Sequence, residues 1–150
     1  MPSLEEALLQ YQFPNEQVKA NLNVLYTAHC LYNRVSAILK PFGVTNEQYN
    51  VLRILRGKHP EAMCQKDILR RMIAPTSNVT LLIKKLGNKQ LISLQQSDRD
   101  KREYQIHITI KGLDLLKNID VAFQENGDTL QKLSTSEAFH LNALLDKLRE

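Results

Sequence analysis

Short polar and basic side chains are concentrated between residues 76 and 89, where they recur at helical spacing. Hydroxyl and amide groups of this size fit close to the edges of nucleic-acid bases, and a lysine reaches guanine acceptors or phosphate oxygens. An apolar residue among them can contact a thymine methyl group. The stretch therefore supplies candidate DNA contacts: Thr76, Ser77, Asn78, Thr80, Leu81, Lys84 and Lys85, with Lys89 as a further phosphate contact.

These candidates also have structural explanations, which the charge distribution helps to weigh. Ser77 and Asn78 belong to the residue types that cap helices, and exposed lysines are commonly solvated. Residues 53–102 hold twelve Lys and Arg against four Asp and Glu, a net charge of +8, whereas the remainder holds eight bases and twelve acids. A basic middle between acidic flanks is expected of a module that binds a polyanion.

A second cluster lies at residues 98–102, where basic and acidic side chains are interleaved. Arg99, Lys101 and Arg102 are candidate DNA contacts, because an arginine on a protruding turn can enter a minor groove of negative potential. Asp98 and Asp100 leave the cluster with little net charge, and we expect them to orient an arginine through a salt bridge. The alternative is a solvated turn.

The first group of candidates requires a helix to hold it. Apolar residues recur at i, i+3, i+4 and i+7 and predict an amphipathic recognition helix over residues 76–89: Val79, Leu82, Ile83 and Leu86. A preceding helix is predicted from about Gln65, and Pro75 separates the two because proline does not fit inside a helix. Two helices joined by so short a turn indicate a helix-turn-helix, whose second helix enters the major groove.

The charged cluster requires a hairpin. Side chains alternate strictly from Tyr104 and predict a strand with one apolar face: Tyr104, Ile106, Ile108 and Ile110. A weaker strand pattern covers residues 92–96, so we expect a hairpin wing over residues 92–110. A helix followed by such a hairpin can dock on a duplex, with the helix in a groove and the hairpin on the neighbouring backbone.

Helices on both sides of this unit position it. Residues 15–41 form a helix with a broad apolar arc, and Thr45 can cap a core helix that ends near Arg56. A helix begins after Thr109 and runs to about Leu133. Ser134-Thr135-Ser136-Glu137 fits a capping box for a last helix, which carries Leu141, Leu144, Leu145 and Leu148 on one face.

The terminal helices have more apolar surface than a monomer of 150 residues would cover. We therefore expect a single domain over residues 1–150, mainly α with a small β-hairpin wing. Residues 45–110 would form the winged helix-turn-helix that binds DNA, and residues 15–41 and 110–150 would form a homodimer. A two-fold protein matches a palindromic site.

Catalytic and metal-binding patterns are absent from the sequence. The four histidines have no carboxylate or cysteine partner at a diagnostic spacing, and no glycine-rich phosphate loop is present. We expect no enzyme activity, metal or cofactor. No apolar run approaches the roughly 18 residues that span a bilayer, and the acidic N-terminus is unlike a signal peptide. These features predict a cytoplasmic protein.

Five residues outside the basic region are candidates for an effector site. Tyr26, His29 and Tyr49 can line a ligand pocket, and core packing is the alternative for all three. Cys30 and Cys64 are candidate redox groups, because a thiol near a helix N-terminus, as expected for Cys64, is more reactive. The alternative is that both are reduced thiols that serve as small, semi-apolar residues.

Three segments resemble the multiple antibiotic resistance regulator (MarR) family of winged helix-turn-helix transcription factors: TSNVTLLIKKL, SDRDKREYQIHITIKG and LSTSE. Arg99, Asp100 and Arg102 match the family's wing signature. Leu81 departs from the family pattern on the DNA face. Gln90 replaces a frequent glycine, and because Gln tolerates positive φ poorly we expect a different turn into the wing. The resemblance implies a homodimeric repressor or activator whose DNA affinity changes with a small ligand or oxidation.

These inferences predict a DNA-binding transcriptional regulator, a homodimer on a palindromic duplex site that is modulated by a small ligand. One alternative is a redox-sensing regulator that uses Cys30 or Cys64. Another is a protein–protein interaction module on a winged-helix scaffold, whose basic face would meet an acidic partner.

Overall fold

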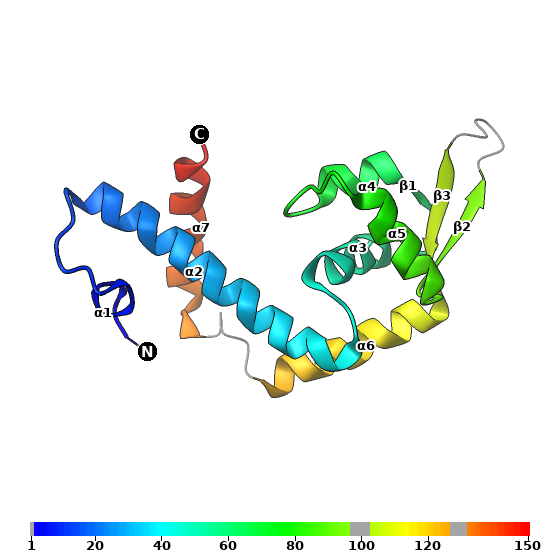
Figure 1. The fold of residues 1–150 in the computed structure, drawn as a ribbon, viewed down its shortest axis with the longest axis horizontal. Coiled ribbons are helices and arrows are strands. Elements are labelled where there is room, and N and C mark those ends of the chain that lie inside the picture. Colours follow the sequence, from blue (N-terminus) through cyan, green and yellow to red (C-terminus); the bar gives the residue numbers. More distant parts are fainter. Residues whose placement is uncertain (1, 97–102, 127–131) are drawn as a thin grey trace.

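The computed structural model describes residues 2–96, 103–126 and 132–150. Three shorter helices and a small three-stranded sheet lie together at one end of the molecule, and a long helix extends away from them (Figure 1). In chain order the elements are α1 (Leu4–Leu8), α2 (Glu16–Leu39), η1 (Lys40–Phe42), α3 (Asn46–Arg56), β1 (Met63–Cys64), α4 (Gln65–Arg71), α5 (Val79–Asn88), β2 (Ile92–Gln96), β3 (Tyr104–Ile108), α6 (Ile110–Glu125) and α7 (Thr135–Leu148).

Side-chain caps set the beginnings of most helices. Asn15, Thr45 and Thr109 each accept a backbone hydrogen bond from the first turn of α2, α3 and α6. The predicted capping box of α7 is present, since the Ser134 and Glu137 side chains each bond the other's backbone N–H. A similar box at Ser3 begins α1, a short helix that the sequence pattern did not reveal. Local side-chain chemistry therefore explains these boundaries.

Helix α6 ends earlier than predicted, at Glu125 rather than near Leu133. Asn126 is its C-cap, and the Asn126 side-chain amide donates to the Ala122 carbonyl at 2.8 Å. This bond occupies a carbonyl of the last turn.

The recognition helix was also predicted too long, because α5 begins at Val79 and not at residue 76. The Thr76 hydroxyl accepts the Asn78 backbone N–H at 3.2 Å, which folds residues 76–78 into a local turn. Asn78 occupies the N-cap position without a side-chain capping bond. Thr76, Ser77 and Asn78 thus precede the helix.

The sheet has three antiparallel strands in the order β1-β3-β2, one more than the predicted hairpin. Strand β1 pairs Met63 with Ile106 and Cys64 with Gln105, and its two residues are too few for a periodic signal. Strand β3 ends at Ile108, so Ile110 does not share the strand's apolar face as predicted. Ile110 is instead the first residue of α6 and is 78% exposed.

Elements α3, α4, α5 and the three strands pack into one core and are called the winged-helix body below. Its fully buried side chains come from helices and strands far apart in sequence, including Leu52, Ile68, Leu86 and Ile106. Helix α6 contributes Leu116 and Ile119 to the same core, and α2 contributes Leu39. The body is therefore continuous with the ends of the long helices.

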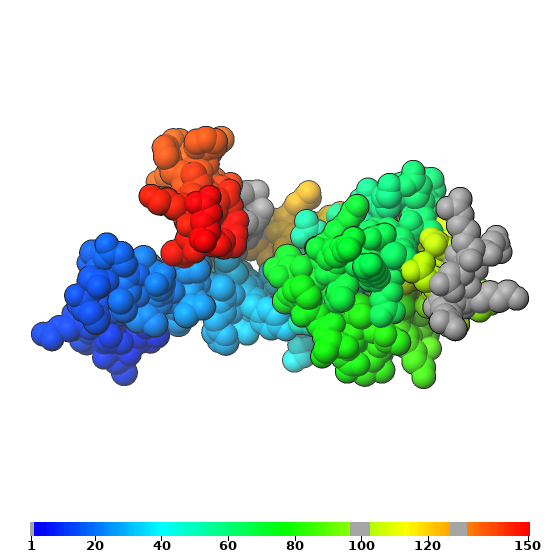
Figure 2. All heavy atoms as spheres, turned by 90° about the horizontal axis from the view of Figure 1, so that it is seen from above, coloured from blue at the N-terminus to red at the C-terminus, as the bar shows by residue number. Residues whose placement is uncertain are grey.

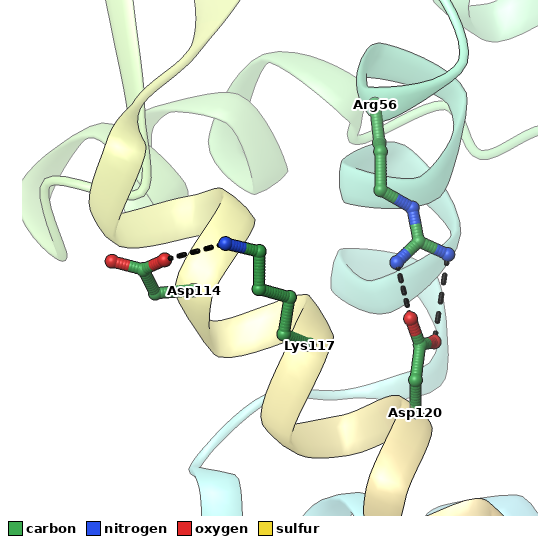
Figure 3. A network of polar contacts seen from close by, with 4 residues as sticks. All are labelled: Arg56, Asp114, Lys117 and Asp120. Carbon is green, nitrogen blue, oxygen red and sulfur yellow. Dashed lines mark hydrogen bonds and ion pairs between the residues drawn. The ribbon is translucent and has the colours of Figure 1, made fainter.

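An ion pair and an aromatic stack fasten α3 to α6. The Arg56 guanidinium donates to both carboxylate oxygens of Asp120, with an Nη1–Oδ2 distance of 2.6 Å (Figure 3). The rings of Tyr49 and Phe123 stack with centroids 5.6 Å apart. A bidentate guanidinium–carboxylate pair fixes orientation as well as distance, so α6 should follow movements of the winged-helix body.

The turn from α5 into the wing contains a residue in left-handed conformation. Gln90 adopts φ +60°, the conformation for which glycine is favoured. Its carbonyl accepts the Thr109 hydroxyl at 2.8 Å, and its N–H donates to the Gly87 carbonyl at 2.8 Å. The expectation of a different turn is therefore wrong for the backbone, because Gln90 itself takes the positive φ and these bonds hold it there.

No helix in the described ranges combines the length and hydropathy needed to cross a bilayer.

Candidate nucleic-acid interface

The outer face of α5 holds four of the predicted DNA contacts. Thr80, Leu81, Lys84 and Lys85 are exposed, and Leu81 keeps 42% of its surface accessible. The opposite face is buried through Val79, Ile83 and Leu86. This division follows from the helical spacing in the sequence, and it leaves the polar row available to a ligand.

The turn before α5 extends this surface. Ser77 and Asn78 are exposed and Thr76 is half-buried. They lie at the N-terminal end of α5, the end that meets base edges when a recognition helix enters the major groove. The structure therefore brings the candidates of residues 76–85 together around one end and one face of a single helix.

Gln65 is a member of this surface that sequence reasoning missed. Its side-chain amide Nε2 donates to the Thr80 hydroxyl at 3.0 Å, which links the first residue of α4 to the second residue of α5. The sequence had marked Gln65 only as a helix start. No periodic or spacing signal connects it to a residue 15 positions away.

Lys84 and Lys85 have no carboxylate partner within the described part of the chain. No salt bridge there involves Lys84 or Lys85, whereas Lys19, Lys58 and Lys117 each pair with an acid. Exposed ammonium groups without local counter-charges are available to neutralise phosphates.

Lys89, a predicted phosphate contact, has hydrogen-bond partners within the protein, unlike Lys84 and Lys85. Its ammonium donates to the Gly43 carbonyl and to Gln48 Oε1, the latter at 3.1 Å. The Lys111 ammonium in turn donates to the Lys89 carbonyl at 2.9 Å. These bonds attach the C-terminal end of α5 to the segment between α2 and α3, and they occupy the Lys89 ammonium although Lys89 stays exposed.

The charged cluster of the wing lies outside the described residues. Strand β2 ends at Gln96 and β3 begins at Tyr104. Arg99, Lys101 and Arg102 as DNA contacts, and Asp98 and Asp100 as their salt-bridge partners, therefore stay predictions from the sequence.

The three pocket candidates are not brought together. Tyr26 is half-buried on α2, where a hydrogen bond with Cys30 raises the pKa of its phenol. His29 is exposed and contacts the Asn33 amide at 2.8 Å. Tyr49 packs on Phe123, and burial raises its pKa.

A cleft at another place lies between α2, η1, α3 and the C-terminal end of α5. Its volume is about 790 Å³. On one side the Tyr32 hydroxyl donates to Glu47 Oε1 at 2.9 Å, which raises the pKa of the Tyr32 phenol. The polar residues that line it are Tyr32, Ser36, Lys40, Thr45, Glu47, Gln48, Lys85, Asn88 and Lys89. The cleft joins the long helix to the recognition helix, and none of the three predicted pocket residues lines it.

The cysteines lie on separate elements. Cys30 is exposed on α2. Cys64 is half-buried at the N-cap position of α4, as expected, and its thiol donates to Asp67 Oδ2 at 3.3 Å. Within the described ranges no three His, Cys, Asp or Glu side chains are grouped so that they could hold a metal ion.

Helix α7 exposes an apolar surface of a different kind. None of its residues is buried, and Phe139, Leu144 and Leu148 keep 71%, 65% and 52% of their surface accessible. Figure 2 shows α7 standing apart from the winged-helix body. On α2, Leu25 and Tyr32 are also exposed, at 68% and 50%. Surface of this kind is unusual on a protein that functions as a monomer.

Comparison with known sequences gives matches over most of the chain. Residues 34–119 match the family described as Transcriptional regulator SarA/Rot. The HTH-type transcriptional regulator MgrA of Staphylococcus aureus is 29% identical over 126 residues, which cover 83% of this chain and 84% of MgrA. An uncharacterized HTH-type transcriptional regulator of Bacillus subtilis, YkoM, is 27% identical over 116 residues, 75% of this chain and 74% of YkoM.

Solved structures share the fold. A complex of S. aureus MepR with DNA aligns with a TM-score of 0.76 at 26% identity, covering 86% of this chain and 94% of that chain. A putative MarR-like transcription regulator from Bacillus cereus aligns with a TM-score of 0.73 at 20% identity, covering 90% and 95%. The likeness to the second protein is one of fold.

Proposed function

This chain belongs to the SarA/Rot family of transcriptional regulators, and from that premise we propose that it controls transcription by binding duplex DNA as a homodimer. The relatives and similar structures confirm the resemblance to MarR-like regulators and the mainly α, winged-helix fold predicted from the sequence. The DNA contacts, the dimer, the palindromic site and the effector belong to the proposal.

The exposed face of α5 carries the proposal. It places the Thr80 hydroxyl and the ammonium groups of Lys84 and Lys85, which have no acidic partner among the described residues, on one side of the second helix of a helix-turn-helix. This composition suits base edges near the helix start and phosphates farther along it. The similar structure of MepR is a complex of that protein with DNA. We assign residues 45–110 to DNA binding, with the wing tip as a second contact.

The apolar faces of the terminal helices support dimerisation. Burial of apolar surface contributes roughly 25 cal/mol per Å², and within one chain α7 buries none of its residues. A second copy offers the same surface in return, as a two-fold interface requires. We propose that residues 15–41 and 110–150 form this interface, which would present two α5 helices to a palindromic site.

The cleft beside Tyr32 is our proposed site for a small effector. It lies where the long helix meets the C-terminal end of α5, and three lysines and a carboxylate line it, so it suits a small polar or anionic molecule. A ligand there would change the angle between α2 and α5 and therefore the spacing of two recognition helices in a dimer. The redox alternative has less support, because Cys30 on α2 and Cys64 at the start of α4 are both free thiols on separate elements and do not pair with each other.

Selection of bound sequences from random duplex DNA tests the proposal. We expect an inverted repeat with half-sites about one helical turn apart, and affinity for it that falls steeply with salt. Lys84→Ala should weaken binding several-fold. Lys117→Ala is the matched control, because this exposed α6 lysine is paired with Asp114 at 3.4 Å and is not among the proposed DNA contacts (Figure 3).

Failure to enrich any duplex sequence would contradict DNA recognition and leave the protein–protein interaction module as the better explanation of the basic face. Enrichment of a single half-site by a monomer would retain the groove contact and remove the dimer. Equal effects of Lys84→Ala and Lys117→Ala on DNA affinity would show that the exposed face of α5 does not contact DNA.

A further inference from the structure

We propose that Gln65 is a positioning residue for DNA recognition, which turns the Thr80 hydroxyl into an oriented hydrogen-bond donor aimed at an acceptor atom of the duplex. The proposal rests on the proposed function, because it assumes that α5 meets DNA. Gln65 lies outside the recognition helix, and through Thr80 it would favour a hydrogen-bond acceptor on the DNA.

The geometry begins with the Gln65 amide. Gln65 Nε2 donates to Thr80 Oγ1 at 3.0 Å, and no other hydrogen bond of the Thr80 side chain is present in the described part of the protein. Gln65 is half-buried whereas Thr80 is exposed, so the bond runs outward from the α4–α5 junction to the surface of α5. Thr80 therefore has one lone pair engaged and its proton free.

This arrangement biases the hydroxyl toward donation. A threonine hydroxyl has one O–H donor and two acceptor lone pairs. Accepting a bond from an amide polarises the O–H group and strengthens its own donation. The acceptors that DNA presents are purine N7, guanine O6 and thymine O4 in the major groove, and the phosphate oxygens. An amino group of cytosine or adenine could bond only through the second lone pair of Thr80 and would leave the strengthened O–H donor unused.

The place of Thr80 on α5 agrees with this chemistry. It is the second residue of the helix, in the turn whose side chains reach base edges in a helix-turn-helix. Lys84 lies one turn further on the same face, and exposed Leu81 is adjacent. The partner of Thr80 lies on α4, so the direction of its hydroxyl depends on how α4 and α5 pack as well as on its own rotamer.

Isosteric substitutions separate the roles of the two residues. Thr80→Val removes the hydroxyl and Gln65→Met removes the amide, each with little change of shape. On the selected duplex at fixed salt, we expect Thr80→Val to weaken binding about tenfold and Gln65→Met about threefold, as for loss or weakening of one hydrogen bond. In the Thr80→Val background, Gln65→Met should have no further effect, because Gln65 acts only through Thr80.

Thr80→Ser retains the hydroxyl and should bind nearly as the unmodified chain does, which guards against a general defect of folding. Thermal unfolding of every variant checks the same point. Modified duplexes identify the acceptor. Replacing purines by 7-deazapurines one position at a time tests N7, and neutral methylphosphonates test the phosphates. At the correct position the modification should weaken the unmodified protein but not Thr80→Val.

Three results would overturn the proposal. Unchanged affinity of Thr80→Val would remove the hydroxyl from recognition, and equal effects of Gln65→Met in both backgrounds would show that Gln65 acts without Thr80. If either occurs while Lys84→Ala still weakens binding, the proposed function survives and only this inference fails. If the unmodified chain binds no duplex, both the proposed function and this inference are wrong.

Discussion

The winged-helix body and helix α7 are both built from amphipathic helices, but they use their apolar faces differently. In the body the apolar residues of α5 lie in a shared core, where Leu86 is fully buried. In α7 the leucine face is open, and Leu144 keeps 65% of its surface accessible. The same helical periodicity therefore builds a buried core in one region and leaves an exposed apolar face in the other, where we propose that it serves assembly.

The difference has an energetic consequence. A substitution in the body acts on the free energy of unfolding of one chain, because its contacts are intramolecular. A substitution on the open face of α7 should act on the association of two chains, and hence on DNA binding through the pairing of recognition helices. The substitutions below test this division, beginning with the largest expected effect.

Leu144→Glu should have the largest effect and should act on assembly. A charge placed in an apolar interface without a partner costs roughly 3–5 kcal/mol, so the dimer dissociation constant should rise at least about a hundredfold. Sedimentation or light scattering over a concentration series measures this, and circular dichroism should show that helical content is retained.

Asn142→Glu is the matched control, because Asn142 is exposed on α7 away from the leucine face. It adds the same charge and should leave association unchanged. If Leu144→Glu instead leaves a dimer intact, or lowers the helical content of the chain, α7 does not have the role in assembly that we propose for it.

Gly112→Ala should act on the winged-helix body itself. A Cβ at Gly112 would lie 2.3 Å from the Leu91 carbonyl oxygen and 2.8 Å from Ile108 Cγ1, so the start of α6 would be displaced from the sheet. We expect a loss of about 3 kcal/mol in the free energy of unfolding, the upper part of the range for overpacking. Chemical denaturation measures it.

Gly57→Ala provides the comparison for this change. A Cβ there meets only ordinary contacts at 3.6 Å, and the backbone is helical. Its stability should be unchanged or slightly higher, since alanine restricts the unfolded chain. A similar loss in both variants would mean that the close approach of Gly112 to Leu91 is not what makes the position sensitive.

The smallest effects are expected for two lysines of the α5 region. Lys84→Ala tests a proposed phosphate contact, and Lys89→Met tests a lysine that bonds to the protein. Lys84→Ala should lower the slope of log affinity against log salt by about one per subunit, because one phosphate contact is lost. Lys89→Met should leave that slope unchanged and lower the free energy of unfolding by about 1 kcal/mol, through loss of hydrogen bonds to Gly43 and Gln48. A reduced salt slope for Lys89→Met would make it a phosphate contact after all.

Much of the fold could be predicted because its signals are local. The capping residues Asn15, Thr45 and Ser134 marked where helices begin, and strand alternation marked β2 and β3. Predictions failed where a pattern was extended past a local bond. The turn closed by Thr76 delayed the start of α5, and Asn126 ended α6.

In the candidate site too, local features could be predicted from the sequence and contacts between distant residues could not. The exposure of Lys84 and the burial of Ile83 follow from helical periodicity alone. The roles of Lys89 and Gln65 do not, because each depends on a partner at least 15 positions away. The cleft beside Tyr32 is formed by four elements and has no sequence signature.

The sequence by itself determined the helices, the hairpin strands and the polar face of α5, because backbone propensity, capping and periodicity act over a few residues. Only the tertiary structure decided which polar side chains of that region are free and which are occupied. It pairs the Lys89 ammonium with the Gly43 carbonyl and the Gln65 amide with the Thr80 hydroxyl. It also adds the short strand β1 to the sheet. The physical reason is that a hydrogen bond between distant residues depends on the packing of the elements that carry them.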